Sequence, residues 1–292
     1  MDEWEMAAVR RAFAMQIMAS VRVSDPRIQA AFAAVRREEF LGPGPWQIMR
    51  WSSVYMPTPS ADPVYLYTND LVAIDPAKQL NNGQPSLHVH LINQAMPAPG
   101  EHVVHIGTGT GYYTAILAHL VGEGGRVTGI EFEPEIAARA RVNLSPLANV
   151  TLMQGDGSTV PFDSADVVYV NAGAARPASS WLDRLKDGGR MVLPLTTEKA
   201  FGTLALEQTP QEIARQGAVL RVERRGDEFL AKWISAVAIF PCVGARDEGS
   251  EHALAASLAN GRLKEVTRLY RHADLPPERI WLNGGDWCLA YS

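Results

Sequence analysis

The sequence lacks features that mark several common classes of protein. It has no run of about 18 apolar residues, so we expect no membrane span. It has no basic excess: 27 Lys and Arg stand against 32 Asp and Glu, a net charge of -5, which argues against binding nucleic acid by phosphate neutralisation. Its two cysteines, Cys242 and Cys288, are too few for a disulfide framework or a four-cysteine zinc site. Their apolar neighbours predict buried free thiols.

The composition that is present is typical of a globular protein. Hydrophobic residues make up 47% of the chain and charged residues 20%, which allows a sizeable core. The first residues, "MDEWEMAAVRRAF", begin acidic and lack the basic-then-apolar order of a signal peptide. We therefore expect a cytoplasmic protein without membrane or nucleic-acid partners. The sequence makes no prediction of oligomeric state.

The first 97 residues predict helices separated by an irregular segment. Residues 3–20 and 26–37 read as helices, the second with Pro26 in its first turn. Residues 42–63 mix prolines and aromatics without periodicity, and such long irregular segments tend to be functional or to cover something. A further helix is expected to start near Pro85.

From residue 102 the sequence alternates between strands and helices. Apolar strands followed by helices predict a parallel sheet covered on both sides. We expect an α/β fold with a doubly wound, mostly parallel, Rossmann-like sheet and antiparallel strands at one edge. The predicted strands are 102–106, 126–131, 149–154, 165–172, 189–195, 203–208, 218–226 and 229–241; the helices are 111–121, 134–144, 177–186 and 250–271; residues 279–292 are predicted to be extended.

Three segments follow from this pattern. Residues 1–97 are expected to form an N-terminal helical and irregular extension. Residues 98–240 form the Rossmann-like core, and residues 241–292 form a C-terminal tail that packs on it.

A glycine-rich turn follows the first strand of the alternating region. Gly107, Gly109 and Gly111 stand in "HIGTGTGYY" and open a helix. Glycine permits positive φ and lets the backbone approach a ligand closely, and ligands of open parallel sheets sit beyond the carboxyl ends of the strands. The turn is therefore a candidate ligand-binding element, although glycine turns also serve merely to end strands.

Two acidic residues follow the next two strands. Glu131 ends "RVTGIE" and is placed to accept hydrogen bonds from ribose hydroxyls, while Asp156 in "MQGDGS" could accept from an adenine amino group. The alternative is that both are solvated acids at strand ends. The turn contains no Arg or Lys, so a phosphate-free, cationic nucleoside such as S-adenosylmethionine suits it better than a dinucleotide.

These motifs resemble those of the protein-L-isoaspartate O-methyltransferase family. The resemblance lies in "VVHIGTGTGYYTAILAHLVGEGGRVTGIEFEPEIAARARVNL", "GDGS", "VYVNAGAARPASSWLDRLKDGGRMVLPL" and "DPRIQAAFAAVRREEFLGPGPW". It covers most of residues 25–195, with an insertion between 43 and 80 and a longer C-terminal tail. It implies a class I S-adenosylmethionine-dependent fold.

The resemblance also implies roles for particular residues. The backbone around Gly107, Thr108, Gly109 and Gly111 would bind the methionine end of the cofactor. Glu131 would bind the ribose, and Asp156 with Gly157 the adenine. Tyr112 would line the cofactor, although packing on the sheet is the alternative.

His105 departs from the family, which usually has an acid before the glycine turn. A neutral imidazole could donate to the carboxylate of the methionine end instead. The other interpretation is a packed histidine at a strand terminus, and both remain open.

The resemblance implies that the methyl acceptor binds at "NNGQPSLHVH", so the extension of residues 1–97 is expected to contribute to the acceptor site. The family carries G-Q-T-I-S here, so Gly83 and Gln84 match. Pro85 follows, and Ser86, which comes one residue early, would be the counterpart of the serine that contacts the substrate carboxyl. Ser86 could instead be a helix N-cap. His88 is a substrate-binding candidate and the one nearby group able to act as a base. His88 and His90 form H-x-H, but on a helix they point to different faces, so we expect no metal.

The resemblance therefore implies a carboxyl O-methyltransferase that uses S-adenosylmethionine and repairs L-isoaspartyl residues of damaged proteins or peptides. A methyltransferase of the same family with another carboxylate, peptide or small-molecule acceptor is the alternative. Two other classes stay open, an NAD(P)-linked oxidoreductase and a non-catalytic adenosine-binding module.

Overall fold

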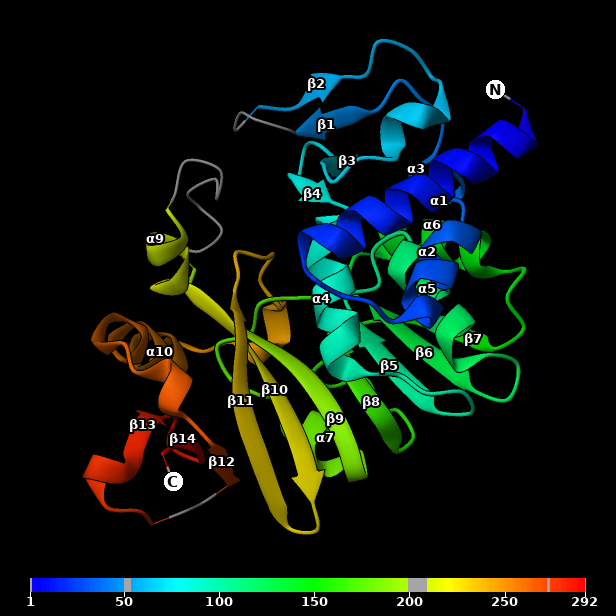
Figure 1. Cartoon of the computed structure of the whole chain (residues 1–292). Coiled ribbons are helices and arrows are strands. Elements are labelled where there is room, and N and C mark those ends of the chain that lie inside the picture. The colour runs from blue at the N-terminus through cyan, green and yellow to red at the C-terminus, as the bar shows by residue number, and fades with distance from the viewer. Residues whose placement is uncertain (1, 50–53, 199–208, 272–273, 292) are drawn as a thin grey trace. The chain divides into compact units, whose positions relative to one another are not determined.

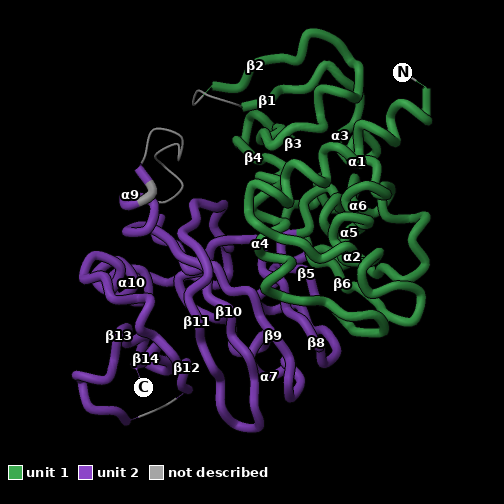
Figure 2. The backbone as a smooth tube through the Cα atoms, viewed as in Figure 1, with its two compact units in different colours: residues 1–103, 108–154 green, residues 104–107, 155–292 purple. Residues whose placement is uncertain are grey.

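The structure is a computed structural model that describes residues 2–49, 54–198, 209–271 and 274–291. Figure 1 shows the helices and strands along the chain. The chain forms two compact units (Figure 2): unit 1 comprises residues 1–103 and 108–154, and unit 2 comprises 104–107 and 155–292. Each unit is described by itself.

Unit 1 begins with helices whose N-termini are capped by aspartates. Asp2 and Glu5 form a reciprocal capping box at the start of α1, and Asp25 accepts from the Arg27 amide at the start of α2, where Pro26 takes the first position. The second predicted helix is shorter than 26–37, because Val35 adopts extended backbone (φ -79°, ψ 120°). The helices are α1 (Glu3–Ser20), α2 (Pro26–Ala34), α3 (Glu38–Leu41) and α4 (Pro85–Ala95).

A small antiparallel sheet occupies much of the segment between α3 and α4. Its strand order is β2-β1-β3-β4, and Val72 of β3 belongs to a buried cluster with Leu41, Trp46 and Leu66. The proline-rich stretch predicted to be irregular thus contains short strands. The elements are β1 (Gln47–Met49), β2 (Met56–Pro57), the 3-10 helix η1 (Pro63–Leu66), β3 (Leu71–Asp75) and β4 (Leu80–Asn81).

The remainder of unit 1 alternates strands and helices as predicted. Strand β6 pairs in parallel with β7, and its first residue, Arg126, donates its amide to Glu101 beside the start of β5. Helix α2 packs against α1, α4 and α5. The elements are β5 (His102–Ile106), whose residues 104–106 belong to unit 2, α5 (Tyr112–Val121), β6 (Arg126–Glu131), α6 (Pro134–Leu144) and β7 (Val150–Gln154).

Unit 2 continues with one parallel pair and then changes direction. Strands β8 and β9 are parallel, whereas β9, β10 and β11 are successive antiparallel neighbours. Its elements include β8 (Ala165–Val170), α7 (Ser179–Asp183), β9 (Leu185–Thr196), α9 (Pro210–Ala214), β10 (Gly217–Arg225) and β11 (Glu228–Ala236). The strand predicted at 203–208 lies outside the described residues.

The C-terminal residues of unit 2 add strands to this antiparallel edge. Helix α10 ends at Asn260, where Gly261 adopts φ 71°, so the prediction of a helix over 250–271 was wrong beyond residue 260. Strand β12 pairs with β11 and β14, and β14 pairs with β13. The elements are η3 (Val243–Ala245), α10 (Glu248–Asn260), η4 (Leu263–Glu265), β12 (Arg268–Arg271), η5 (Pro277–Arg279), β13 (Ile280–Asn283) and β14 (Trp287–Ala290).

These observations confirm the predicted α/β class, with a mostly parallel centre and an antiparallel edge. Cys242 and Cys288 are free and buried, as expected. Among the described residues no helix combines the length and apolar character that a membrane crossing requires. The division into segments 1–97, 98–240 and 241–292 stays a prediction.

Candidate functional site

The glycine turn in unit 1 is closed by its own backbone and held by neighbouring elements. The Gly111 amide donates to the Thr108 carbonyl at 3.2 Å. Gly111 has φ 104°, and a methyl group added there would lie 2.9 Å from Leu144 Cγ. The Asn143 side chain donates to the Thr110 carbonyl at 2.9 Å. Glycine is therefore required at Gly111 both by the dihedral angle and by close packing against α6.

Gly109 differs from Gly111 in the space around it. Its φ is 58°, and a methyl group added there would meet Ile74 Cδ1 at 3.7 Å, an ordinary van der Waals contact. Ile74 belongs to β3, so the inserted small sheet reaches the glycine turn within unit 1. The Arg139 guanidinium donates to the Ile74 carbonyl at 2.7 Å and holds this strand beside α6.

Glu131 is bonded to the same turn. Its Oε2 accepts from the Gly109 amide at 2.6 Å and its Oε1 from the Glu133 amide at 3.1 Å. The side chain is buried, and desolvation raises the pKa of this carboxyl although the backbone hydrogen bonds oppose the shift. A carboxylate offers about four lone-pair sites, so each oxygen can accept a further bond from a ligand hydroxyl.

In unit 2, Gly107 directly follows Ile106, the last residue of β5, which neighbours β8 in the sheet. Gly107 has φ 79°, and an added methyl group would lie 2.8 Å from the Asn171 carbonyl oxygen. Asn171 in turn donates its amide to Ile106 at 2.8 Å and its side-chain nitrogen to Gly107 at 3.2 Å. Gly107 and Thr108 are adjacent in the chain, so the turn joins directly to this anchored strand end.

His105 is fully buried in unit 2, edge-on to the Tyr169 ring at a centroid distance of 5.3 Å. Burial lowers the pKa of His105 to about 3, so the imidazole is neutral at physiological pH. These surroundings favour the packed interpretation over direct contact with a ligand.

Asp156 and Gly157 form a tightly held loop in unit 2. Asp156 Oδ1 accepts from both the amide and the hydroxyl of Ser158, at 2.9 and 2.8 Å. A methyl group on Gly157 would lie 2.3 Å from Ile106 Cγ2, and the Trp181 indole donates to the Gly157 carbonyl at 2.7 Å. Only glycine fits at residue 157, and the loop keeps the half-buried Asp156 carboxylate in a defined position.

The acceptor candidates lie at the start of α4 in unit 1. Gln84 is the N-cap residue, Pro85 takes the first position and Ser86 the second, so the interpretation of Ser86 as N-cap was wrong. The buried Ser86 donates its amide to Asn69 Oδ1 at 2.8 Å. His88 is also buried, stacked on Tyr113 at a centroid distance of 3.4 Å. This stacking makes His88 part of the packing beneath the acceptor segment.

Tyr112 packs among the N-terminal helices. The side chain is fully buried, with ring centroids 6.3 Å from Phe32 and 5.8 Å from Phe40. These surroundings favour the packing alternative for Tyr112 over contact of its side chain with a cofactor. Within the described part of the chain no three His, Cys, Asp or Glu side chains group in a way that could hold a metal ion.

Two further residues near the site were missed by the sequence reasoning. Phe132 follows Glu131 and is 44% exposed, although Ile130 and Glu131 before it are buried. An exposed aromatic ring directly after the acidic strand end is a signal that the sequence contained. Asn69 carried no recognisable signal, because its contact with Ser86 spans 17 residues.

Parallel strands linked by helices, a glycine turn after one strand and an acid at the end of the next define a Rossmann-like α/β protein of the nucleotide- and nucleoside-binding class. A family model described as Protein-L-isoaspartate(D-aspartate) O-methyltransferase (PCMT) matches residues 10–222. The chain belongs to this family.

Several known proteins are similar to the chain. Protein-L-isoaspartate O-methyltransferases from Ignicoccus hospitalis and Thermotoga maritima are 39% and 32% identical over 132 and 185 residues, which is 44% and 61% of this chain. These alignments cover 63% and 53% of the relatives, so the chain spans between about half and two thirds of their length. The enzyme of the same name from Cronobacter sakazakii is 28% identical over 76% of this chain and 89% of its own.

Two solved structures share the fold. One, a protein-L-isoaspartate O-methyltransferase, has a TM-score of 0.63 and 21% identity over 97% of this chain and 87% of its own. The other, from Plasmodium falciparum, was solved in complex with S-adenosyl-L-homocysteine and has a TM-score of 0.60 and 13% identity over 80% of this chain and 97% of its own.

Proposed function

We propose that the chain is an S-adenosylmethionine-dependent methyltransferase that methylates the free α-carboxylate of L-isoaspartyl residues in damaged proteins or peptides. The observation that carries the proposal is the bond between the Gly109 amide and the buried Glu131 carboxylate. It joins a glycine turn without basic residues to an acid at a strand end. Membership of the family supports the reaction, and the relatives' names supply the substrate class.

The residues present fit S-adenosylmethionine. Glu131 has lone pairs left for the two ribose hydroxyls, and the space at Gly109 allows close approach to the backbone. Asp156 and Gly157 are proposed for the adenine, as the family resemblance implies. The exposed Phe132 ring adds an apolar face on which an adenine could stack. The backbone of Thr108 and Gly107 is proposed for the methionine end, with His105 supporting the strand that carries it.

The proposed reaction needs no general acid or base from the protein. When bound, S-adenosylmethionine supplies a methyl group on a sulfonium. A carboxylate acceptor is already ionised at neutral pH, so no proton has to be removed before the carboxylate oxygen attacks. The protein's part is then to align the two reactants and to exclude water. Ser86 and Gln84 are neutral hydrogen-bonding groups suited to orienting a carboxylate, and we propose them for that role.

Matched peptides test this proposal. The chain is incubated with labelled S-adenosylmethionine and peptides that differ only in an isoaspartyl or aspartyl residue. We expect methyl esters on the isoaspartyl peptide and at least about a hundredfold preference over the aspartyl one. The two residues differ in the position of one methylene and one amide relative to the free carboxylate, and the pocket must discriminate between them by that difference. Equal labelling of both peptides, or none, would contradict the repair function.

A different carboxylate acceptor in the same family is the second candidate. Pro85 separates Gln84 from Ser86, and the inserted β1–β4 sheet reaches the glycine turn through Ile74. Both features alter the acceptor side relative to the family pattern. A cytoplasmic location, and action without a membrane or nucleic-acid partner, stay predictions.

A further inference from the structure

The N-terminal turn of α4, which carries Ser86, is held by a side chain from outside the helix. The N-cap residue Gln84 forms no side-chain capping bond within the described chain. The Ser86 amide donates instead to Asn69 Oδ1 at 2.8 Å. An unsatisfied amide in the first turn of a helix is normally capped by a neighbouring residue. Here the acceptor comes from 17 positions earlier in the chain, so the orientation of this turn depends on where Asn69 lies.

Asn69 is itself fixed by Arg37. The guanidinium of Arg37, a residue with 0% exposure, donates to the carbonyl oxygens of Leu66 and Thr68 at 2.5 and 3.1 Å and to that of Asp70 at 3.2 Å. These three carbonyls surround Asn69 in the chain. The planar five-donor guanidinium is suited to binding several fixed acceptors at once. Arg37 therefore clamps the loop that presents the Asn69 side chain.

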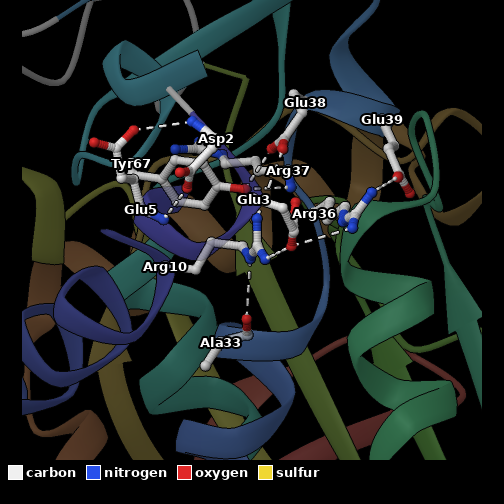
Figure 3. Close-up of polar contacts among 10 residues, drawn as sticks. All are labelled: Asp2, Glu3, Glu5, Arg10, Ala33, Arg36, Arg37, Glu38, Glu39 and Tyr67. Carbon is white, nitrogen blue, oxygen red and sulfur yellow. Dashed lines mark hydrogen bonds and ion pairs between the residues drawn. The ribbon is translucent and has the colours of Figure 1, made fainter. Parts of the chain in front are cut away.

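The clamp is anchored in the N-terminal helices. The Arg37 amide donates to the Tyr67 hydroxyl at 3.1 Å, and that hydroxyl is bonded to the Glu38 carboxylate. Figure 3 shows the Tyr67 hydroxyl together with its partners, Arg37 and Glu38. The extended residue Val35, which ends α2, precedes Arg37 by two positions.

A second contact joins the same turn to the cofactor-side helix. The Tyr113 hydroxyl donates to the Gly83 carbonyl at 3.3 Å, and the Tyr113 ring stacks on His88. Tyr113 stands two residues after Gly111, so within unit 1 this contact ties the acceptor segment to the glycine turn. A methyl group at Gly83 would lie 2.4 Å from His88 Nε2, so the backbone at Gly83 packs closely against the His88 ring.

From these contacts we infer that Asn69, clamped by Arg37, is a positioning residue that sets where Ser86 and Gln84 stand in the acceptor site. This inference rests on the proposed function for the meaning of the acceptor site. The position of the α4 turn itself does not depend on that function. Asn69 replaces a local helix cap, and it acts through Ser86 rather than on the substrate.

The test uses Asn69→Ala and Asn69→Asp in the full chain. We expect Asn69→Ala to speed amide hydrogen exchange at Ser86 roughly fivefold or more, the size of a lost cap, and to raise the KM for an isoaspartyl peptide by a similar factor. The affinity for S-adenosylhomocysteine should change less than about twofold, because Asn69 bonds to Ser86 and the Gly109–Glu131 bond does not involve it. Asn69→Asp keeps an acceptor oxygen, and its charge suits a helix N-terminus, so it should restore both values.

Asp247→Ala is the matched control. Asp247 caps α10 by accepting from the Ser250 amide at 2.8 Å, a bond of the same kind at a different helix. It should leave Ser86 exchange and KM unchanged. Unchanged Ser86 exchange in Asn69→Ala would overturn the inference, as would faster exchange with an unaltered KM. A wild-type chain that methylates no isoaspartyl peptide would instead refute the proposed function, while the exchange measurement still decides whether Asn69 holds Ser86.

Discussion

Burial acts on two titratable residues of the site in opposite directions. Glu131 is pushed towards its neutral form, and its pKa rises, while the pKa of His105 falls to about 3. The charged form is disfavoured in both cases. Glu131 keeps hydrogen bonds from the turn that favour its charged form, whereas His105 lies beside the Tyr169 ring. Glu131 therefore suits a ligand-binding role, and His105 a supporting one.

The depressed pKa of His105 predicts a pH-dependent stability. In the unfolded chain this histidine takes up a proton near pH 6.5, while the folded chain does not until about pH 3. The stability that His105 confers is complete above about pH 6.5 and is lost as the pH falls towards 3. Between pH 7.5 and pH 5 the loss should be about 2 kcal/mol.

Urea unfolding at these two pH values measures that loss. His105→Gln keeps a polar side chain without a titrating ring, so its unfolding free energy should fall less than that of the wild type over the same range. The difference between the two proteins cancels the contributions of other groups. An identical decrease in both would show that His105 is not a buried neutral imidazole.

At the scale of single elements, the glycine turn combines one packed glycine with one that has space beside it. Gly111 lies against Leu144, and Gly109 faces Ile74 at ordinary contact distance. The sequence predicted the turn and its glycines from their place after an apolar strand. It could not separate their roles, because Leu144 and Ile74 come from elements distant in the chain.

Alanine at the two glycines should therefore have different effects. Gly111→Ala combines a left-handed φ with a clash and should lower the unfolding free energy by about 3 kcal/mol or more. Gly109→Ala should lower the unfolding free energy only by the dihedral penalty, about 1 kcal/mol, so this variant should fold. Its affinity for S-adenosylhomocysteine should be lower, because the methyl group takes up the space beside the backbone that is proposed for the ligand. Thermal melts and calorimetry on both variants check this. A Gly111→Ala variant as stable as Gly109→Ala would contradict the packing described for α6.

Helix α4 shows where local sequence rules gave a wrong assignment. A serine after a turn signals an N-cap, but Pro85 already takes the first helical position, which moves the cap to Gln84. The bond that holds Ser86 comes from Asn69. The packing of Tyr112 could not be predicted from local sequence for a related reason: Phe32 and Phe40, which contact its ring, lie more than 70 positions earlier in the chain.

At the scale of the whole molecule, the alternation of strand and helix patterns in the sequence predicted the fold class correctly. From the period of the apolar residues and from the glycine and proline signals, the bounds of the elements from β5 to α6 were predicted to within one residue. The C-terminal part was less predictable. Strands β12 to β14 are short, and they are stabilised by pairing with β11 and with one another, a long-range effect that no local pattern contains.

The account depends most on the claim that Glu131 and the glycine turn bind a phosphate-free sulfur nucleoside. Isothermal titration of the wild-type chain and of Glu131→Gln with S-adenosylhomocysteine, and with NADH as the control ligand, tests it most directly. We predict that the wild type binds S-adenosylhomocysteine and that its affinity weakens as the pH falls through the raised pKa of Glu131. The affinity of Glu131→Gln should be lower by roughly tenfold or more, because hydrogen bonds to a charged acceptor contribute about 1.5–3 kcal/mol. Tight NADH binding, or equal affinity of both proteins for S-adenosylhomocysteine, would contradict it.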